Sequence, residues 1–168
     1  TLVMTSDEEK LLEHDPLLQL PNFDQEYHLN INQVELNFLS PLRLIKKGKL
    51  LNVKTLTARD LLMSLAKRIN LINEFHNNYQ LFEHFSELSQ LADDINIHLE
   101  LDWKDWSRYS NKQHRKIPIG GLVGSITLSG NLFPFVPLIY LGQWFHIGKN
   151  TTFGLGQYQL SLPKVINS

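Results

Sequence analysis

Apolar and polar residues alternate along several segments of the chain, and a two-residue period of this kind predicts strands with one buried face. The clearest segment is 95–103, where Ile, Leu and Trp side chains face one way and Asn, His, Glu and Asp side chains face the other. A run from 27 to 38 changes parity at Asn32-Gln33, which predicts a bulge or a tight break there. We expect further strands at 122–128 and 157–162.

Apolar residues three or four positions apart predict helices between these strands. The first begins at Thr57-Ala58-Arg59-Asp60, which has the form of a capping box with Asp in place of Glu. Lys67 and Arg68 lie on its polar face. Its apolar face is formed by Leu61, Leu62, Leu65, Ile69, Ile72 and Phe75. A short helix is expected near 80–92, and another over 131–146, where two prolines fit a first turn.

In chain order these elements are strand, helix with a small extra helix, strand, strand, helix and strand. This order indicates an α+β, ferredoxin-like (RRM-like) split βαβ fold, with an antiparallel sheet and two main helices on one face. RNA-recognition modules share this topology. We assign residues 26–168 to this domain. Residues 1–25 are acidic and carry Pro16 and Pro21, so we interpret them as a linker or the remnant of a preceding domain.

The composition excludes several classes of protein. The chain has 168 residues, of which 42% are apolar and 10% aromatic, which suits one packed domain and argues against disorder. The absence of Cys excludes disulfides, thiolate metal sites and a Cys nucleophile. No apolar run reaches the roughly 20 residues of a membrane span, and no signal peptide opens the chain. The histidines lack metal-ligand spacing. We therefore expect no metal, no cofactor, no membrane association and a cytoplasmic location.

The net charge of −1 hides a strong asymmetry along the chain. All 17 acidic residues lie in residues 1–105, which carry ten Lys and Arg, for a net charge of −7. Residues 106–168 carry six Lys and Arg and no acid, and most of the glycines lie in this part. The basic end is therefore suited to meet an anion.

The basic connection 104–118 holds the densest group of cations. Its candidate RNA-binding residues are Arg108, Lys112, Arg115 and Lys116. Lys offers a point charge to a phosphate and Arg a forked pair of donors. His114 lies among these cations, which should disfavour its protonated form and suit a general base. The alternative interpretation of this segment is a solvated loop tip.

A glycine-rich loop over residues 148–156 is the second candidate. Gly148, Gly154 and Gly156 would let backbone N–H groups converge on a phosphate, and Lys149 adds a charge beside them. The order of the glycines is neither that of a nucleotide P-loop nor that of a dinucleotide fold. The alternative is a tight turn that needs positive φ. We expect His146, just before the loop, to cap the preceding helix.

Three motifs in the basic end resemble a known family. They are Gly120-Gly121-Leu122-Val123-Gly124-Ser125-Ile126, Phe145-His146-Ile147-Gly148-Lys149 and Thr152-Phe153-Gly154-Leu155-Gly156. They resemble the C-terminal half of the CRISPR-associated endoribonucleases that process repeat RNA, members of the RAMP superfamily. Upstream, Phe38-Leu39-Ser40-Pro41-Leu42-Arg43-Leu44, the helix 61–75 and residues 103–110 extend the resemblance over residues 34–160.

The resemblance implies two ferredoxin-like domains in tandem, of which we expect this chain to hold the second. It implies cleavage within the CRISPR repeat without a metal, by attack of the upstream 2′-OH, leaving a 2′,3′-cyclic phosphate. In many members the assisting histidine lies in the N-terminal domain. His114, with Arg115 and Lys116, is the stand-in on this chain. The glycine-rich loop and the basic hairpin would contact the repeat RNA, the hairpin against its stem.

Two alternatives remain at this stage. The chain could be a non-catalytic RAMP subunit that holds guide RNA inside a CRISPR effector complex, with other effector subunits as partners and oligomerisation left open. It could also be an α+β domain whose basic end binds a protein or an unrelated polyanion.

Overall fold

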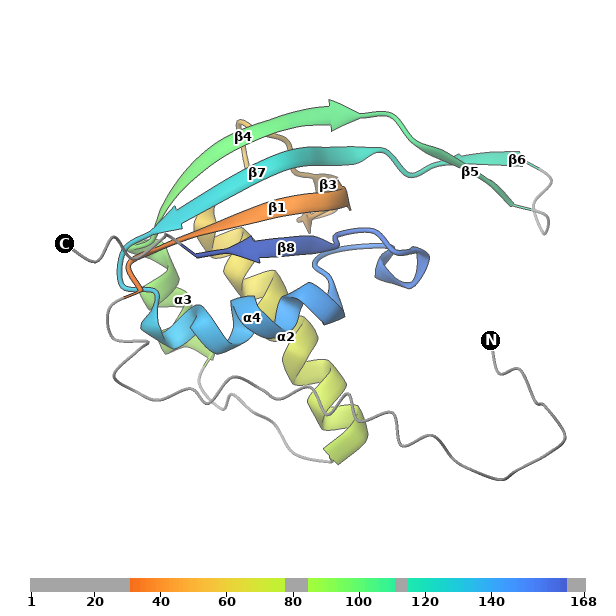
Figure 1. Cartoon of the computed structure of the whole chain (residues 1–168). Coiled ribbons are helices and arrows are strands. Elements are labelled where there is room, and N and C mark those ends of the chain that lie inside the picture. The colour runs from red at the N-terminus through yellow and green to blue at the C-terminus, as the bar shows by residue number, and fades with distance from the viewer. Residues whose placement is uncertain (1–30, 78–84, 111–114, 163–168) are drawn as a thin grey trace, which may run out of the picture.

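The computed structural model describes residues 31–77, 85–110 and 115–162. Four strands form the main sheet: β1 (Gln33–Leu42), β4 (Asn96–Lys104), β7 (Gly121–Ser129) and β8 (Tyr158–Ser161). Their order is β4-β7-β1-β8, and every neighbouring pair is antiparallel (Figure 1). This is the strand order of a split βαβ fold, so the predicted fold class is confirmed.

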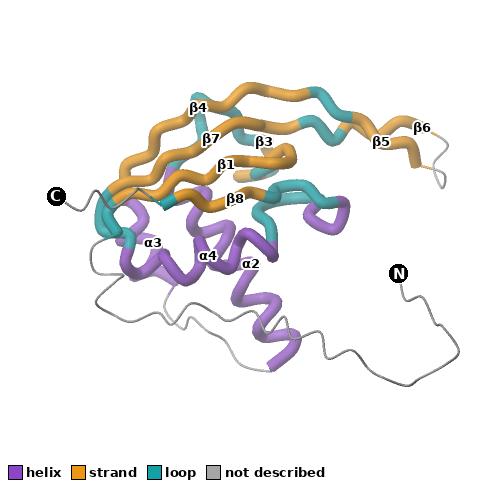
Figure 2. Tube along the Cα trace, in the orientation of Figure 1, coloured by secondary structure: helices purple, strands orange, loops and turns teal. Residues whose placement is uncertain are grey.

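The helices cover one face of this sheet, and its other face is open (Figure 2). They are α2 (Ala58–Asn77), α3 (Phe85–Asp93) and α4 (Val136–Phe145), with short 3₁₀ turns η1 (Phe133–Phe135) and η2 (Thr151–Phe153). The core between the layers is made of strand residues such as Leu36 and Ile126 and helix residues such as Leu65 and Ile139. The buried Tyr158 hydroxyl donates to the carbonyl of Ile139, which ties β8 to α4.

Two small hairpins extend from the sheet. The first, β2 (Ile45–Lys46) and β3 (Lys49–Leu50), turns at Lys47 and Gly48, with φ of 49° and 76°. Positive φ at both central residues is the requirement of a tight hairpin turn. The second, β5 (Ser107–Ser110) and β6 (Arg115–Pro118), projects beyond the ends of β4 and β7 (Figure 1). The basic connection is therefore a hairpin.

β1 begins at Gln33, at the predicted break, and residues 31–32 before it are not part of the strand. A second irregularity, which the pattern did not predict, lies inside β1, where its register against β7 shifts between Phe38 and Leu42. Pro41 lies in this interval and has no N–H to offer a ladder. The N–H groups of Leu39 and Ser40 both donate to the carbonyl of Gln157 instead. Residues 27–30 of the predicted strand lie outside the described residues.

Helix α2 begins as predicted, but its last two turns differ from the expected core helix. The Asp60 N–H donates to Thr57 Oγ1 at 3.1 Å, and the Thr57 hydroxyl donates to the Asp60 carboxylate at 2.7 Å. Leu61 to Ile69 supply buried residues, whereas Phe75 is 82% exposed. A helix of 20 residues is about 30 Å long, and α2 runs past the edge of the sheet and α4 (Figure 1). The expectation that Phe75 lies in the core is therefore wrong.

Candidate nucleic-acid interface

The β5–β6 hairpin carries three of the predicted RNA-binding residues. Its register pairs Arg108 with Ile117, Tyr109 with Lys116 and Ser110 with Arg115. Lys116 is exposed. Lys112 and His114 lie in residues 111–114, outside the described residues. The fold therefore places Arg108, Arg115 and Lys116 on a ribbon that stands away from the helical layer, while the contacts of all these residues with RNA remain a prediction.

The base of this hairpin is a close-packed Gly-Gly turn. A Cβ on Gly120 would lie 2.8 Å from the carbonyl oxygen of Lys104, and one on Gly121 would lie 2.6 Å from that of Leu42. The guanidinium of Arg43 donates to the carbonyl of Gly120. Arg43 thereby links the segment after β1 to the start of the projecting ribbon.

Backbone hydrogen bonds hold the glycine-rich loop against that same segment. Gly148, with φ of 91°, forms a parallel bridge with Arg43, and the Lys149 N–H donates to the Arg43 carbonyl at 2.8 Å. The Gly156 N–H donates to the Pro41 carbonyl at 3.0 Å, and the Gly154 N–H stays within the loop. The N–H groups of Lys149, Gly154 and Gly156 are thus already used. The positive φ of all three glycines supports the tight-turn interpretation of the loop's shape, and the predicted RNA contacts of these residues stay untested.

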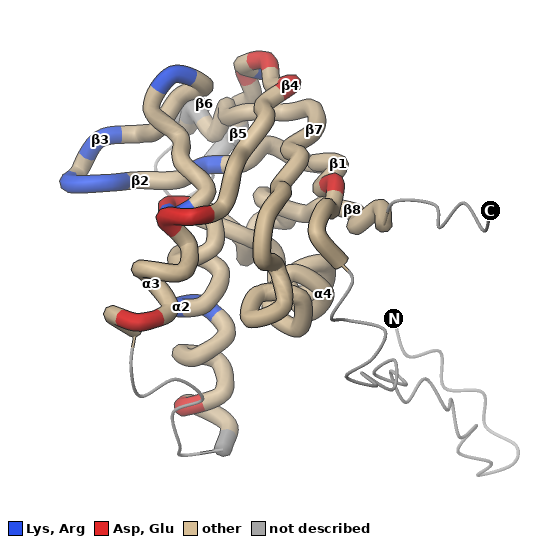
Figure 3. Tube along the Cα trace, turned by 90° about the vertical axis from the view of Figure 1, so that its left-hand side faces the viewer, with Lys and Arg blue, Asp and Glu red and all other residues tan. Residues whose placement is uncertain are grey.

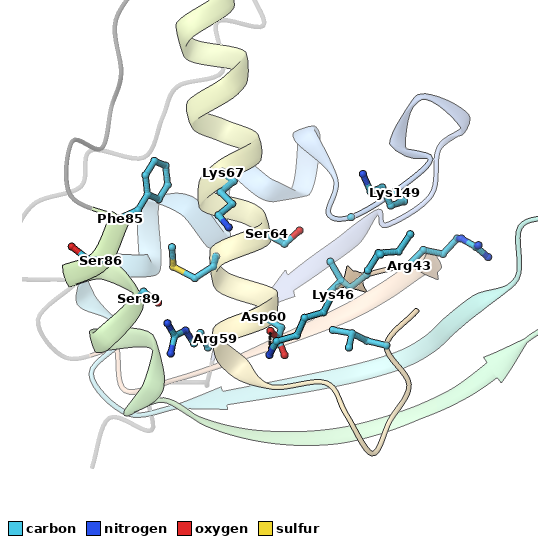
Figure 4. A pocket seen from close by; sticks show the side chains of 15 residues that line it. Arg43, Lys46, Arg59, Asp60, Ser64, Lys67, Phe85, Ser86, Ser89 and Lys149 are labelled. Carbon is cyan, nitrogen blue, oxygen red and sulfur yellow. Dashed lines mark ion pairs between the residues drawn. The ribbon is translucent and has the colours of Figure 1, made fainter. Parts of the chain in front are cut away.

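A cavity of about 700 Å³ lies between the β2–β3 hairpin, the first half of α2, the start of α3 and the glycine-rich loop (Figure 4). Five cations and one carboxylate are among its lining residues: Arg43, Lys46, Arg59, Lys67, Lys149 and Asp60. Asp60, Ser64 and Lys67 recur every three or four residues, so one face of α2 lines the cavity. Sequence reasoning missed this group because its cations come from segments far apart in the chain.

Asp60, the carboxylate of this cavity lining, forms an ion pair with Lys46. Lys46 Nζ lies 2.6 Å from its carboxylate. Burial alone would raise the pKa of Asp60, but hydrogen bonds from Lys46 and Thr57 outweigh it and hold the pKa below its usual value. Asp60 therefore stays ionised at neutral pH and holds Lys46 beside the helix N-terminus.

His146 ends α4 and begins the glycine-rich loop. Its N–H donates to the Gly142 carbonyl at 2.8 Å, which confirms it as the cap of the helix. Its φ of 59° and ψ of 165° place it in a region that residues other than Gly rarely adopt. Burial and the nearby charge of Arg68 lower the pKa of His146, against an opposing hydrogen bond with the Leu155 backbone. The imidazole is therefore neutral at neutral pH.

The open face of the sheet is polar and carries carboxylates. Glu35 on β1 and Glu100 and Asp102 on β4 point to this side, opposite the buried residues of the same strands. The outward positions of β7 and β8 add hydroxyl and amide side chains such as Ser125, Thr127 and Gln159. RNA-recognition modules stack bases on aromatic rings at this face. At the outward positions of the four described strands, the one aromatic ring is the imidazole of His98, which lies 3.4 Å from Glu100. These positions carry no Phe, Tyr or Trp, so this face lacks the larger stacking rings of such modules.

A family model, the CRISPR-associated endoribonuclease Cas6, matches residues 36–158. The chain belongs to the Cas6 family. The match covers more than half of the chain and agrees with the resemblance over residues 34–160. No curated protein matches the chain.

Solved Cas6 structures share its fold at low sequence identity. A partial Cas6-RT-Cas1–Cas2 complex matches with a TM-score of 0.59 and 20% identity, covering 82% of this chain and 24% of that one. A Cas6 product complex matches with a TM-score of 0.54 and 17% identity, covering 82% and 55%. Thermus thermophilus Cas6 matches with a TM-score of 0.57 and 15% identity, covering 77% and 53%. The chain therefore spans about half the length of these Cas6 proteins, and a quarter of the longer Cas6-RT-Cas1 chain.

No group of three or more His, Cys, Asp or Glu is placed to hold a metal ion within residues 31–77, 85–110 and 115–162. None of the helices described is long and apolar enough to cross a membrane.

Proposed function

We propose that this chain is the RNA-binding, C-terminal domain of a Cas6 endoribonuclease that cuts CRISPR repeat transcripts into guide RNAs. The observation that carries the proposal is the Cas6 family match over residues 36–158, which includes most of the ferredoxin-like fold. A basic hairpin that stands clear of that fold supports it. The solved relatives include Cas6 proteins with a substrate mimic and with product.

In the proposed complex the β5–β6 hairpin contacts the stem of the repeat. Arg108, Lys112, Arg115 and Lys116 would neutralise phosphates of the stem, and Lys149 would contact the adjoining strand. A handful of such contacts makes RNA affinity fall by about 10³-fold or more over a fourfold rise in salt. The carboxylates of the open sheet face would keep the RNA away from that side.

The proposed reaction needs no metal. A general base takes the proton of the upstream 2′-OH, whose oxygen attacks the adjacent phosphorus, and a general acid protonates the departing 5′ oxygen. The products are a 2′,3′-cyclic phosphate and a 5′-hydroxyl end. His114 is the proposed base or acid on this chain, with Arg115 and Lys116 stabilising the charge on the phosphate. In a two-domain enzyme, a histidine of the preceding domain takes this place.

Incubation of the natural full-length protein with end-labelled repeat RNA in EDTA tests the proposal. We expect one cut within the repeat and an upstream fragment that migrates as a cyclic phosphate until acid opens the ring. RNA that binds but stays intact would favour the alternative, a non-catalytic RAMP subunit that holds guide RNA beside other CRISPR effector proteins in the cytoplasm. The His114→Ala variant then shows whether this chain supplies the histidine: lost cleavage with unchanged RNA affinity assigns the role to His114, and unchanged cleavage excludes it.

A further inference from the structure

We propose that the cavity between the β2–β3 hairpin, α2, α3 and the glycine-rich loop binds an unpaired segment of RNA next to the stem. The inference rests on the proposed function and adds a second RNA site to it. The site would take the phosphates and one splayed nucleotide of a single strand, while the β5–β6 hairpin takes the paired stem.

The charges in the cavity favour an anion. Lys46 is neutralised by Asp60, and Arg59 is paired with Asp93 of α3 at 2.8 Å. Within the described residues, no carboxylate lies within ion-pairing distance of Lys67 or Lys149. Both have exposed side chains, one from the middle of α2 and one from the glycine-rich loop (Figure 4). Two unneutralised ammonium groups beside one hollow are suited to adjacent phosphates.

The rest of the lining favours a nucleotide over an inorganic phosphate. Leu44, Leu51, Met63 and Phe85 contribute apolar surface, and Ser64 and Ser86 contribute hydroxyl groups. Pockets for drug-sized ligands measure about 300–1,000 Å³, and this cavity lies within that range. Unpaired bases are recognised by stacking on aromatic and apolar side chains, with phosphates on nearby cations. The cavity combines both kinds of surface.

The position of the cavity relative to the hairpin favours a strand that continues from the stem. The Arg43 carbonyl holds the backbone of Lys149 at the cavity, and the Arg43 guanidinium holds Gly120 at the base of the β5–β6 hairpin. One residue therefore connects both surfaces. A stem bound on the hairpin would leave its single-stranded flank free to reach the cavity.

Binding of three RNAs to the chain tests the site: a repeat stem-loop with blunt ends, the same stem-loop with an eight-nucleotide unpaired flank, and the flank alone. We expect the flank to tighten binding about tenfold or more, since each stacked base and phosphate contact adds affinity. The double variant Lys67→Glu, Lys149→Glu should lose this gain and retain its affinity for the blunt stem-loop. The control Lys47→Glu, Lys54→Glu makes the same change in net charge at positions that do not line the cavity and should keep the gain.

A second measurement locates the bound strand. With 5-iodouridine in the flank, irradiation should give adducts on peptides that contain Met63 or Phe85. Adducts confined to other peptides, or a flank effect equal in both double variants, would overturn the inference. If an oligoglutamate peptide added before irradiation suppresses these adducts at concentrations where unlabelled flank RNA does not, the cavity belongs to an acidic protein segment and the inference is overturned. Failure of the blunt stem-loop to bind counts against the proposed function. Binding of the flank alone, and its loss in the Lys67→Glu, Lys149→Glu variant, tests the cavity independently of the stem.

Discussion

The glycine-rich loop and the β5–β6 hairpin are both predicted to contact RNA through basic residues. They differ in what holds them in place. The loop is fixed by backbone hydrogen bonds to Pro41 and Arg43. The hairpin extends past the sheet and is paired with itself (Figure 1). In the loop, the glycines are needed for the backbone conformation, and Lys149 supplies the charge. In the hairpin, we expect side-chain substitutions to change RNA binding more than they change the fold.

The largest effect should come from Gly156→Ala in the loop. A methyl group there would overlap the Ile147 carbonyl oxygen, at a φ of 72°. We expect the free energy of unfolding to fall by about 3 kcal/mol or more, as measured by urea denaturation. The matched control is Gly154→Ala, with a φ of 80° and open space around the added methyl, which should cost only about 1–2 kcal/mol. Equal losses in the two variants would contradict the close contact.

The hairpin should show the reverse behaviour. Changing Arg108, Lys112, Arg115 and Lys116 together to Ala should weaken binding of stem-loop RNA about 100-fold and flatten its salt dependence. The urea midpoint should stay the same, because these residues belong to a ribbon outside the core. Fluorescence anisotropy at several salt concentrations measures both quantities. An unchanged RNA affinity would show that the hairpin is only a solvated loop.

A smaller effect is expected from Lys149→Ala. The Lys149 backbone N–H, which the substitution keeps, holds the loop to Arg43. The variant should therefore fold with unchanged stability and lose one phosphate contact, about three- to tenfold in affinity for flanked RNA. A clear loss of stability would mean that the side chain supports the loop.

The smallest effect is a pH dependence at the start of the loop. The pKa of His146 is lowered by burial and by Arg68, so the unfolded chain binds the proton more readily than the folded one. The contribution of His146 to stability is therefore complete above its ordinary pKa of about 6.5 and is lost as pH falls below that value. An NMR titration of the His146 ring should give a pKa below 6.5, and Arg68→Gln should raise it. A value at or above 6.5 in the unchanged chain would contradict the burial.

Local patterns predicted most of the strands and helices, because residues close together in sequence determine where such an element forms. The alternation over 95–103 became β4, and the capping box at Thr57 began α2. Phe75 was misplaced because helical spacing carries no information on where the sheet beneath a helix ends. The register shift inside β1 was not predicted because it depends on Pro41 and a carbonyl more than 100 residues away.

The site was predictable only where its residues are consecutive. The run from Arg108 to Lys116 was visible as a basic segment, and the fold made it a hairpin. The cavity is assembled from residues near 43–46, 59–67 and 149, and nothing in any one segment signals the others. The hydrogen bonds from the Lys149 and Gly156 N–H groups were equally invisible, because their acceptors, the carbonyls of Arg43 and Pro41, lie more than 100 residues away in sequence.

The carboxylates of the open sheet face have a consequence for the approach of RNA. Glu35, Glu100 and Asp102 lie on the open side of the sheet, and Figure 3 shows the Lys residues of the β2–β3 hairpin well apart from the acidic residues of β1 and β4. An anionic sheet face would repel a polyanion, so RNA would be steered toward the hairpins during the encounter at low ionic strength. Reversing the charge of Glu35 and Glu100 adds positive charge, so it should speed the first encounter with RNA and direct part of it to the open face, without removing any contact of the bound state.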